Sequence, residues 1–244
     1  MKITFLGTSH GYAEKGRFTS ATLIEVGENY YLLDAGAPIE YLFVNNDKPY
    51  ENLRGIFLTH MHNDHVGSLS SVVEPMLRYR FNDKATCFFP SRQGMDGFAN
   101  WLYTLDVKKE VLDKTVKFEL VNEGKIFDDG KVCVYARRNL HKGVGGASFG
   151  YIFEAEGKRV FFTGDMSQEF SEYCEYVGSE HYDLVVCEGA HSPIVRAAEK
   201  LKGTNTDRMI INHVYFESVE GFDDVAKTLP FPCEIAEDML EIKL

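Results

Sequence analysis

A short apolar strand that runs directly into a cluster of histidines limits most strongly what this chain can fold into. Residues 55–59 read Gly-Ile-Phe-Leu-Thr, and the next six positions contain His60, His62, Asp64 and His65. Imidazole nitrogens and carboxylate oxygens are the usual non-thiolate ligands of Zn²⁺ and related divalent ions. Because a buried strand holds the side chains at its end rigidly, the pattern predicts a metal site at the rim of a β-sheet.

Three later polar residues also end predicted apolar strands, which makes them candidates for further ligands. These residues are His141, Asp165 and His213. A lone histidine is usually a satisfied polar group, and Gly-Asp is a common turn, so none of them is diagnostic by itself. Their shared position at strand ends, downstream of the first cluster, indicates a site for two metal ions.

Composition places the chain among globular proteins and argues against broad binding of nucleic acid. The 244 residues are 44% hydrophobic and carry a net charge of −11, whereas phosphate binding needs Lys and Arg. Two basic runs are local exceptions, and such runs are usually solvated faces. They comprise Arg78, Arg80, Lys84 and Arg92, and then Arg137, Arg138 and Lys142. No apolar run is long enough to span a bilayer and no signal peptide is recognisable, so we expect a cytoplasmic protein.

The five cysteines are odd in number and widely spaced. This spacing argues against a disulfide framework and against a cysteine-based metal site. We expect them to be small buried apolar residues.

Short β-rich runs alternate with helical patterns along the chain. Strands are predicted at 2–6, 21–26, 30–34, 55–59, 85–89, 116–121, 131–137, 149–155, 160–163, 184–187, 209–212 and 234–235. A short turn should join 21–26 to 30–34 in antiparallel fashion, and 149–155 should form a hairpin with 160–163. Helices are predicted at 96–105, 168–176, 194–201 and 222–229, and at 66–79, where Pro75 should kink or end the helix. The pattern repeats after residue 115. We therefore expect an α/β fold in one domain, 1–244, with similar halves of roughly 1–115 and 116–244 and two sheets packed face to face with helices outside.

The order of the candidate ligands resembles that of the metallo-β-lactamase-fold hydrolase superfamily. Its signature is His-x-His-x-Asp-His, followed by a His, an Asp after Gly, and a final His. The resemblance covers the whole chain and implies a four-layer αββα sandwich built on two mixed β-sheets. It assigns one metal to His60, His62 and His141, the second to Asp64, His65 and His213, and the bridge between them to Asp165. It also matches Leu33-Asp34-Ala-Gly, whose Asp34 would support a ligand histidine.

Within that superfamily, three further phrases are most similar to the branch that contains RNase Z and small phosphodiesterases. They are Phe5-Leu-Gly-Thr-Ser, Arg17-Phe-Thr-Ser-Ala and Glu188-Gly-Ala-His191. RNase Z enzymes carry a long arm that grips tRNA, but His141 and Asp165 are only 24 positions apart, which leaves no room for it there. The missing arm and the acidic charge argue against tRNA processing and leave a small phosphodiester or a related ester as substrate.

The resemblance also implies a mechanism and roles for individual residues. Two divalent ions ~3.5–4 Å apart share one water and lower its pKa, so that hydroxide forms near neutral pH. We expect Zn²⁺, with Mn²⁺ or Fe²⁺ as alternatives. Asp64 would orient the nucleophile, while His191 would either stabilise or protonate the leaving oxygen or serve as a structural hydrogen bonder. His10 either lines the pocket or is solvated, and His181 is expected at the surface.

The sequence thus predicts a metal-dependent hydrolase of a small or cyclic phosphodiester. The alternative is a hydrolase of carbon esters, thioesters or lactones, because the same site attacks carbonyls. A metal-binding module without turnover is the third reading. The aromatic residues between Phe88 and Tyr103 either pack inward or form a lid or a homodimer contact, and their helical spacing favours the core.

Overall fold

The structure, a computed structural model, describes residues 1–79 and 85–244, so Arg80 and Lys84 of the first basic run lie outside the described residues. The chain divides into two compact units, and each contains one β-sheet. Unit 1 consists of residues 1–7, 11–121 and 238–243, and unit 2 of residues 8–10, 122–237 and 244. The expectation that residues 1–244 form one domain stays a prediction.

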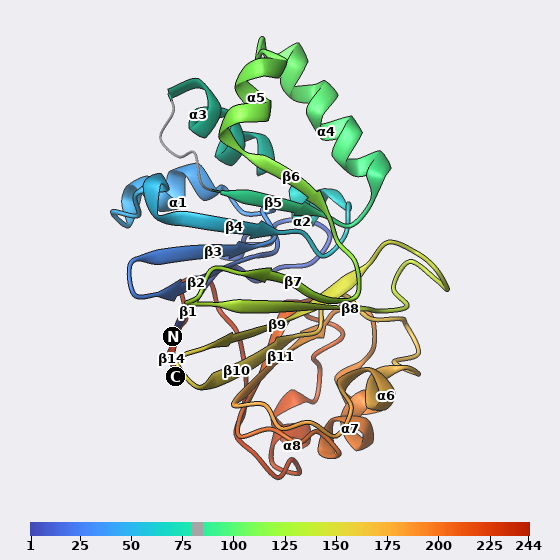
Figure 1. Cartoon of the computed structure of the whole chain (residues 1–244). Helices are drawn as coiled ribbons and strands as arrows, with labels where there is room; N and C mark the ends of the chain where they lie inside the picture. The colour runs from blue at the N-terminus through green and yellow to red at the C-terminus, as the bar shows by residue number, and fades with distance from the viewer. Residues whose placement is uncertain (80–84) are drawn as a thin grey trace. The chain divides into compact units, whose positions relative to one another are not determined.

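The sheet of unit 1 has seven strands in the order β14-β1-β2-β3-β4-β5-β6 (Figure 1). The strands are β1 (Lys2–Gly7), β2 (Ala21–Val26), β3 (Asn29–Leu33), β4 (Leu53–Phe57), β5 (Thr86–Phe89), β6 (Lys117–Leu120) and β14 (Glu241–Lys243). Pairing is antiparallel from β14 to β3, which confirms the predicted hairpin at the second and third strands. Pairing is parallel from β3 to β6.

The sheet of unit 2 also has seven strands, in the order β13-β12-β11-β10-β9-β8-β7. The strands are β7 (Gly124–Asp128), β8 (Cys133–Arg138), β9 (Phe149–Ala155), β10 (Lys158–Phe162), β11 (Leu184–Gly189), β12 (Met209–Val214) and β13 (Cys233–Ile235). Pairing is parallel from β13 to β10 and antiparallel from β10 to β7. The predicted β9–β10 hairpin is confirmed, and its turn residues Glu156 and Gly157 have φ of 54° and 73°, as a two-residue turn requires.

Strand direction decides where polar side chains gather in each unit. In unit 2, β8, β10, β11 and β12 all run the same way, so the segments after their carboxyl ends meet at one edge of the sheet. In unit 1, β3 and β4 are parallel neighbours, and the segments that follow them are likewise adjacent. This is the edge at which open α/β sheets bind ligands.

Helices cover the sheet of unit 1 on one face and bury an apolar cluster there. They are α1 (Ile39–Asn45), α2 (Asn63–Val66), α3 (Leu69–Tyr79), α4 (Arg92–Thr104) and α5 (Lys109–Thr115), with a 3₁₀ turn η1 (Tyr50–Asn52). Leu32 and Ile56 of the sheet share this cluster with Val72 and Met76 of α3. Burial of such side chains supplies the main stabilising free energy of the unit and fixes the strands that carry the site.

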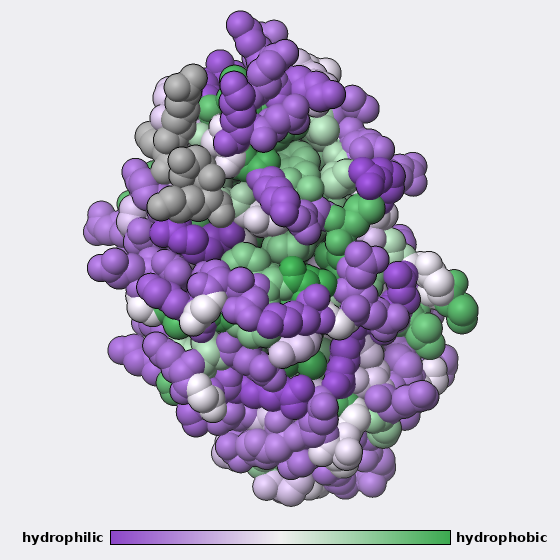
Figure 2. Space-filling view, in the orientation of Figure 1, coloured by the Kyte–Doolittle hydropathy of each residue, from purple (hydrophilic) through white to green (hydrophobic). Residues whose placement is uncertain are grey.

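Unit 2 repeats this arrangement with α6 (Tyr173–Val177), α7 (Ile194–Lys202) and α8 (Phe222–Ala226). Phe161 and Ile211 of its sheet share a buried cluster with Tyr173 and Leu201 of the helices. No helix among the described residues is long and apolar enough to cross a membrane. The face in Figure 2 is largely hydrophilic, with small apolar areas between polar side chains.

Several predicted helices need correction. Pro75 lies inside α3 and does not end it; the break falls between Val66 and Leu69 instead. Helix α4 begins earlier than predicted because the Ser91 side chain accepts a hydrogen bond from Gly94 N and caps the helix. Its Trp101 is 53% exposed, so the aromatic residues of this region do not all pack inward.

The five cysteines are all free. Cys87 and Cys187 are buried as predicted, and burial raises the pKa of both thiols. Cys174, in contrast, is exposed on α6.

Candidate metal-binding site

Unit 1 brings the four residues of the first motif together directly after β4. The His60 ring lies 4.4 Å from the His62 ring and 4.2 Å from the His65 ring, between centroids. Nε2 of His65 is 3.4 Å from Oδ2 of Asp64. The short helix α2 begins inside the motif and turns Asp64 and His65 back toward His60. The cluster therefore presents imidazole nitrogen and carboxylate oxygen at close range, the donor set expected for a divalent ion.

A buried network behind the motif orients its histidines. Oδ2 of Asp34 is 2.7 Å from Nδ1 of His65, and the Thr59 hydroxyl donates to the same carboxylate and lies 3.1 Å from Nδ1 of His60. Acceptors at both Nδ1 atoms favour the tautomer that leaves Nε2 available as a ligand. Asp34 thus contacts a candidate ligand histidine, and its role in supporting a metal ligand stays a prediction. Thr59 was not predicted as a site residue, and its position directly before His60 is the only sequence feature that indicates such a role.

Backbone contacts hold the motif from two further segments of unit 1. Ala35, next to Asp34, donates its N–H to the His65 carbonyl oxygen at 2.7 Å. Gly11 donates its N–H to Oδ2 of Asp64, also at 2.7 Å. A carboxylate that accepts such a bond is held in one orientation, as a ligand or as an acceptor for the nucleophile.

In unit 2 the carboxylate of Asp165 lies among three histidines. Its Oδ2 is 3.8 Å from Nε2 of His141 and 3.9 Å from Nε2 of His191, and its Oδ1 is 3.6 Å from Nε2 of His213. These distances are too long for hydrogen bonds. Two donors that each lie ~2.1 Å from one ion are ~3–3.5 Å apart, so these distances are slightly longer than those between ligands of a bound metal. Asp165, His191 and His213 each offer a ligand atom within 4.8 Å of one another.

The loop that carries His141 is tied to the end of β10. Asn139 donates from Nδ2 to the Thr163 carbonyl oxygen at 3.2 Å and accepts from His141 N at 3.3 Å. The Tyr176 hydroxyl donates to the same Thr163 oxygen at 2.8 Å, and burial raises the pKa of this phenol, so it stays a donor. Gly164 follows with a φ of 62°, and a Cβ there would lie 2.6 Å from the Phe149 carbonyl oxygen. Glycine is therefore required immediately before Asp165.

His191 is held by Glu188, a buried carboxylate that the sequence did not single out as a site residue. Oε2 of Glu188 accepts the backbone N–H groups of Ala190 at 2.6 Å and His191 at 3.0 Å, and its Oε1 lies 3.4 Å from His191 Nδ1. The His191 ring also stacks on the His213 ring at 5.7 Å. The phrase Glu188-Gly-Ala-His191 contained this signal, because a lone carboxylate ends an otherwise apolar strand.

His10, for which the sequence left two roles open, and His181, which was expected at the surface, lie in different surroundings. His10, in unit 2, has its ring 4.5 Å from Tyr215 and 6.3 Å from His213, so it lies beside a candidate ligand and is not a solvated loop residue. His181 is exposed and forms a 3.0 Å contact with Asp207, which confirms its expected surface position.

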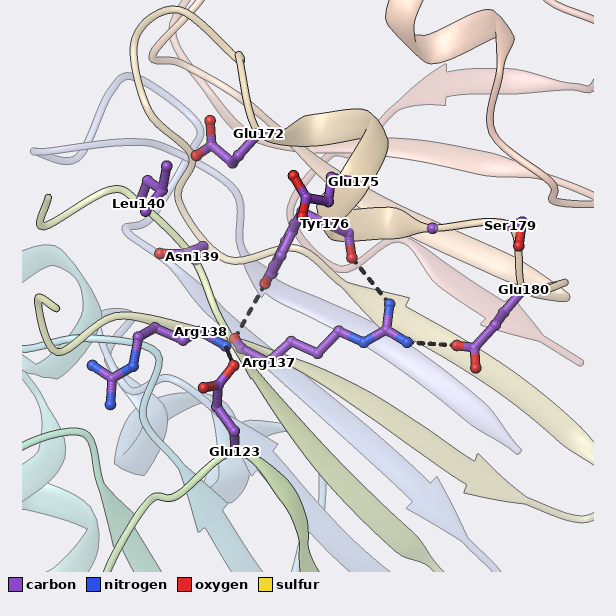
Figure 3. A pocket seen from close by; sticks show the side chains of 11 residues that line it. Glu123, Arg137, Arg138, Asn139, Leu140, Glu172, Glu175, Tyr176, Ser179 and Glu180 are labelled. Atoms are coloured by element: carbon purple, nitrogen blue, oxygen red, sulfur yellow. Dashed lines mark hydrogen bonds and ion pairs between the residues drawn. The ribbon is translucent and has the colours of Figure 1, made fainter. Parts of the chain in front are cut away.

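A cleft of about 640 Å³ opens in unit 2 beside the loop that carries His141 (Figure 3). Arg137 donates to carbonyl oxygens at the end of α6 and to Glu180 at 2.5 Å, while Arg138 lies 4.7 Å over the Phe149 ring. Lys142 is exposed. The second basic run therefore contributes to the structure and to the solvated surface.

Comparison with known proteins agrees with this architecture. A family model described as Anti-Pycsar protein Apyc1 matches residues 1–191. A ribonuclease Z of Limosilactobacillus fermentum is 31% identical over 159 residues, which cover 63% of this chain and 49% of that protein. The chain thus spans about half the length of the curated relatives it matches.

Solved structures share the fold at lower sequence identity. The metallo-β-lactamase fold protein YhfI from Bacillus subtilis superposes with a TM-score of 0.77 at 17% identity, covering 99% of this chain and 98% of that one. The short form of human tRNase Z gives 0.73 at 19% identity, covering 100% and 99%. The predicted metallo-β-lactamase fold of two mixed sheets with helices, and the likeness to the RNase Z and phosphodiesterase branch, are confirmed. The chain belongs to the family described as Anti-Pycsar protein Apyc1.

Proposed function

We propose that this protein is a metal-dependent hydrolase that cleaves a small or cyclic phosphodiester. The observation that carries the proposal is the carboxylate of Asp165 with three histidine Nε2 atoms 3.6–3.9 Å away. Together with the unit 1 cluster, this set matches in type and order the ligands of a dinuclear hydrolase. Two bound divalent ions, with Zn²⁺ as the preferred candidate, would act as Lewis acids and would lower the pKa of a bound water.

The protein's own residues then have distinct tasks in the proposed reaction. His60, His62 and His141 would bind one ion, Asp64, His65 and His213 the other, and Asp165 both. Asp64, held by the Gly11 amide, would also accept a hydrogen bond from the attacking water and so orient it.

His191 is the proposed general acid of the reaction. Its Nδ1 lies 3.4 Å from Oε1 of Glu188, a contact that orients the ring, and Nε2 would give a proton to the leaving oxygen. The 3.9 Å distance between this Nε2 and Asp165 Oδ2 supports a role of the ring next to the bound ions.

Metal analysis and a substrate panel test the proposal together. We expect two divalent ions per chain, and turnover of cyclic phosphodiesters and bis(p-nitrophenyl) phosphate that chelation abolishes and Zn²⁺ or Mn²⁺ restores. His141→Ala should lose metal and activity, whereas the exposed His181→Ala should lose neither. Selective turnover of a p-nitrophenyl ester or a lactone would favour the carbon-ester alternative. Two bound metals without turnover of any substrate would favour a binding module.

Other expectations stay predictions with their own measurements. A cytoplasmic location, a homodimer and the absence of stable nucleic-acid binding can be checked by fractionation, light scattering and a tRNA binding assay. Cleavage of precursor tRNA would contradict the preference for small substrates.

A further inference from the structure

Strand β12 contains one added residue at the position of the candidate ligand His213. Glu188 of β11 pairs with Asn212. The next residue of β11, Gly189, pairs with Val214, so His213 forms a β-bulge between the two parallel strands. Bulges bend a strand and re-aim a side chain, and they are over-represented next to active sites. The bulge therefore sets the direction in which the His213 side chain leaves the sheet.

The backbone of His213 has a conformation that residues with a side chain rarely adopt. Its φ is 52°, in the left-handed region, where the Cβ of an L-residue comes too close to the following carbonyl oxygen. Such a conformation costs free energy and persists only where the surrounding structure enforces it. The segments packed against the bulge must therefore hold His213 in place.

Two segments of unit 2 contact the bulge closely. A Cβ added to Gly189 would lie 2.5 Å from Cγ2 of Ile211, a branched side chain in the buried cluster of this unit. Glycine is thus required for β11 to approach β12 this closely. In addition, Val214 donates its N–H to the Thr8 carbonyl oxygen at 2.7 Å and forms a parallel bridge with Ser9. The strand is therefore held immediately before and immediately after His213.

We propose that Gly189 is a positioning residue, which lets β11 approach the bulge and so holds His213 in the left-handed conformation that directs its ring to Asp165. The ring has Nε2 3.6 Å from Oδ1 of Asp165 and stacks on the His191 ring with 7° between the planes. The inference rests on the proposed function, because it assigns a purpose to the strain only if His213 binds a metal ion.

Unfolding of metal-free variants tests whether the bulge strains residue 213. In a strand, glycine is normally less stable than alanine. At a left-handed position the order reverses, so His213→Gly should have a higher urea midpoint than His213→Ala. Asn212→Gly and Asn212→Ala are the matched pair at a neighbouring residue of β12 without a positive φ, and they should show the ordinary order. The ordinary order at both positions would overturn the inference.

Replacing Gly189 tests whether the bulge positions His213 for a metal ion. Gly189→Ala adds a methyl group against Ile211 Cγ2 and should push β12 away from β11. We expect the affinity for one of the two ions to fall about tenfold or more, together with a changed visible absorption spectrum of the Co²⁺-substituted protein. Gly203→Ala, at the end of α7, is the control, because its Cβ meets its nearest neighbour at 3.5 Å.

A second substitution separates positioning from a general loss of stability. Ile211→Ala removes the group that the new methyl meets, so Gly189→Ala/Ile211→Ala should recover both the metal affinity and the Co²⁺ spectrum. Ile211→Ala alone should lower the urea midpoint, because it leaves a cavity in the core, and should keep the metal affinity. Equal losses of affinity in Ile211→Ala and Gly189→Ala would show that affinity follows stability, and would overturn the inference.

The metal content of the unmodified protein separates this inference from the proposed function. Fewer than two bound ions would reject the proposed function. A crystal structure of metal-free Gly189→Ala then decides the inference without any metal. A His213 ring displaced from its 3.6 Å distance to Asp165 would support the positioning role, and an unchanged ring would overturn it.

Discussion

Gly36 lies so close to Asp64 that a Cβ added to the glycine would be 1.8 Å from the Asp64 carbonyl oxygen. The loop after β3 and the metal motif after β4 thus touch backbone to backbone. Because this contact is closer than any side chain allows, the spacing between the carboxylate of Asp34 and the candidate ligand His65 depends on a glycine.

Replacing Gly36 should therefore damage the metal site. Gly36→Ala must displace the Asp64 backbone, so we expect loss of stability by about 2 kcal/mol or more and weaker metal binding. Gly97→Ala is the matched control, because its Cβ meets nothing within 4 Å in α4. It should stabilise the helix slightly. Urea unfolding and metal titration of both variants measure the difference, and equal metal affinity would contradict the close contact.

Removing the charge of Asp34 should lower the affinity for metal more than it lowers the stability of the fold. Its φ is 58°, a conformation that asparagine tolerates, so Asp34→Asn keeps the backbone while losing the carboxylate that faces His65. We expect metal affinity to fall about 10–100-fold, as for other supporting carboxylates. Asp47→Asn, at an exposed residue with a φ of 51°, should leave affinity unchanged. Competition with a chromophoric chelator measures both.

The Thr59 hydroxyl should matter for stability. Thr59→Val keeps the shape of the side chain but leaves the buried Asp34 carboxylate and the His60 ring without this partner. The expected cost is about 1–3 kcal/mol in the free energy of unfolding. Thr59→Ser retains the hydroxyl and should recover most of it. If Val and Ser unfold at the same urea concentration, the hydroxyl is not the stabilising group.

Asp183 should make stability depend on pH. Burial favours a higher pKa, but Lys158 Nζ at 2.7 Å and the Arg159 amide at 2.8 Å outweigh it and hold the pKa of Asp183 below its usual value. A carboxyl with a lowered folded pKa stabilises the protein above its unfolded pKa of ~3.9, and this stabilisation is lost as pH falls through the folded value.

Asp183→Asn should accordingly lower the urea midpoint at neutral pH, and the difference in midpoint from the unmodified protein should disappear as pH falls through the folded pKa of Asp183. Glu199→Gln, at an exposed i,i+3 pair with Lys202, should have little effect at any pH. A gap that stays constant from neutral to acid pH would show that the ionised Asp183 carboxylate is not responsible.

The strands that carry the candidate site could be predicted from the sequence, because each is an apolar run that ends in a polar candidate ligand. β9 matches its predicted bounds, and Asp165 follows β10 as expected. His213 lies inside β12, because this strand runs to Val214 and does not end at residue 212 as predicted. Strands β7 and β14 were missed. β7 is only partly buried, and β14 has three residues of which Ile242 alone is buried, so neither shows an apolar pattern.

The supporting residues were harder to predict because their partners are distant in the sequence. Asp34 was proposed from family resemblance, and its partner His65 is 31 positions away. Glu188 accepts a backbone hydrogen bond from His191 in the turn that follows it. It lies in a fully buried strand, where its carboxylate interrupts an apolar run. Asn139 and Tyr176 meet at the Thr163 carbonyl oxygen, a backbone atom that no sequence pattern displays.

Pairing between β1 and β14 also sets an order of events during synthesis. Lys2 pairs with Lys243 and Ile3 with Ile242, so one edge of β1 has its partner only after residues 241–243 have left the ribosome. Until then β1 exposes unpaired N–H and C=O groups, a state that favours pairing with other chains. A nascent chain that stalls before residue 241 should therefore aggregate or recruit chaperones more readily than one in which β14 has been made.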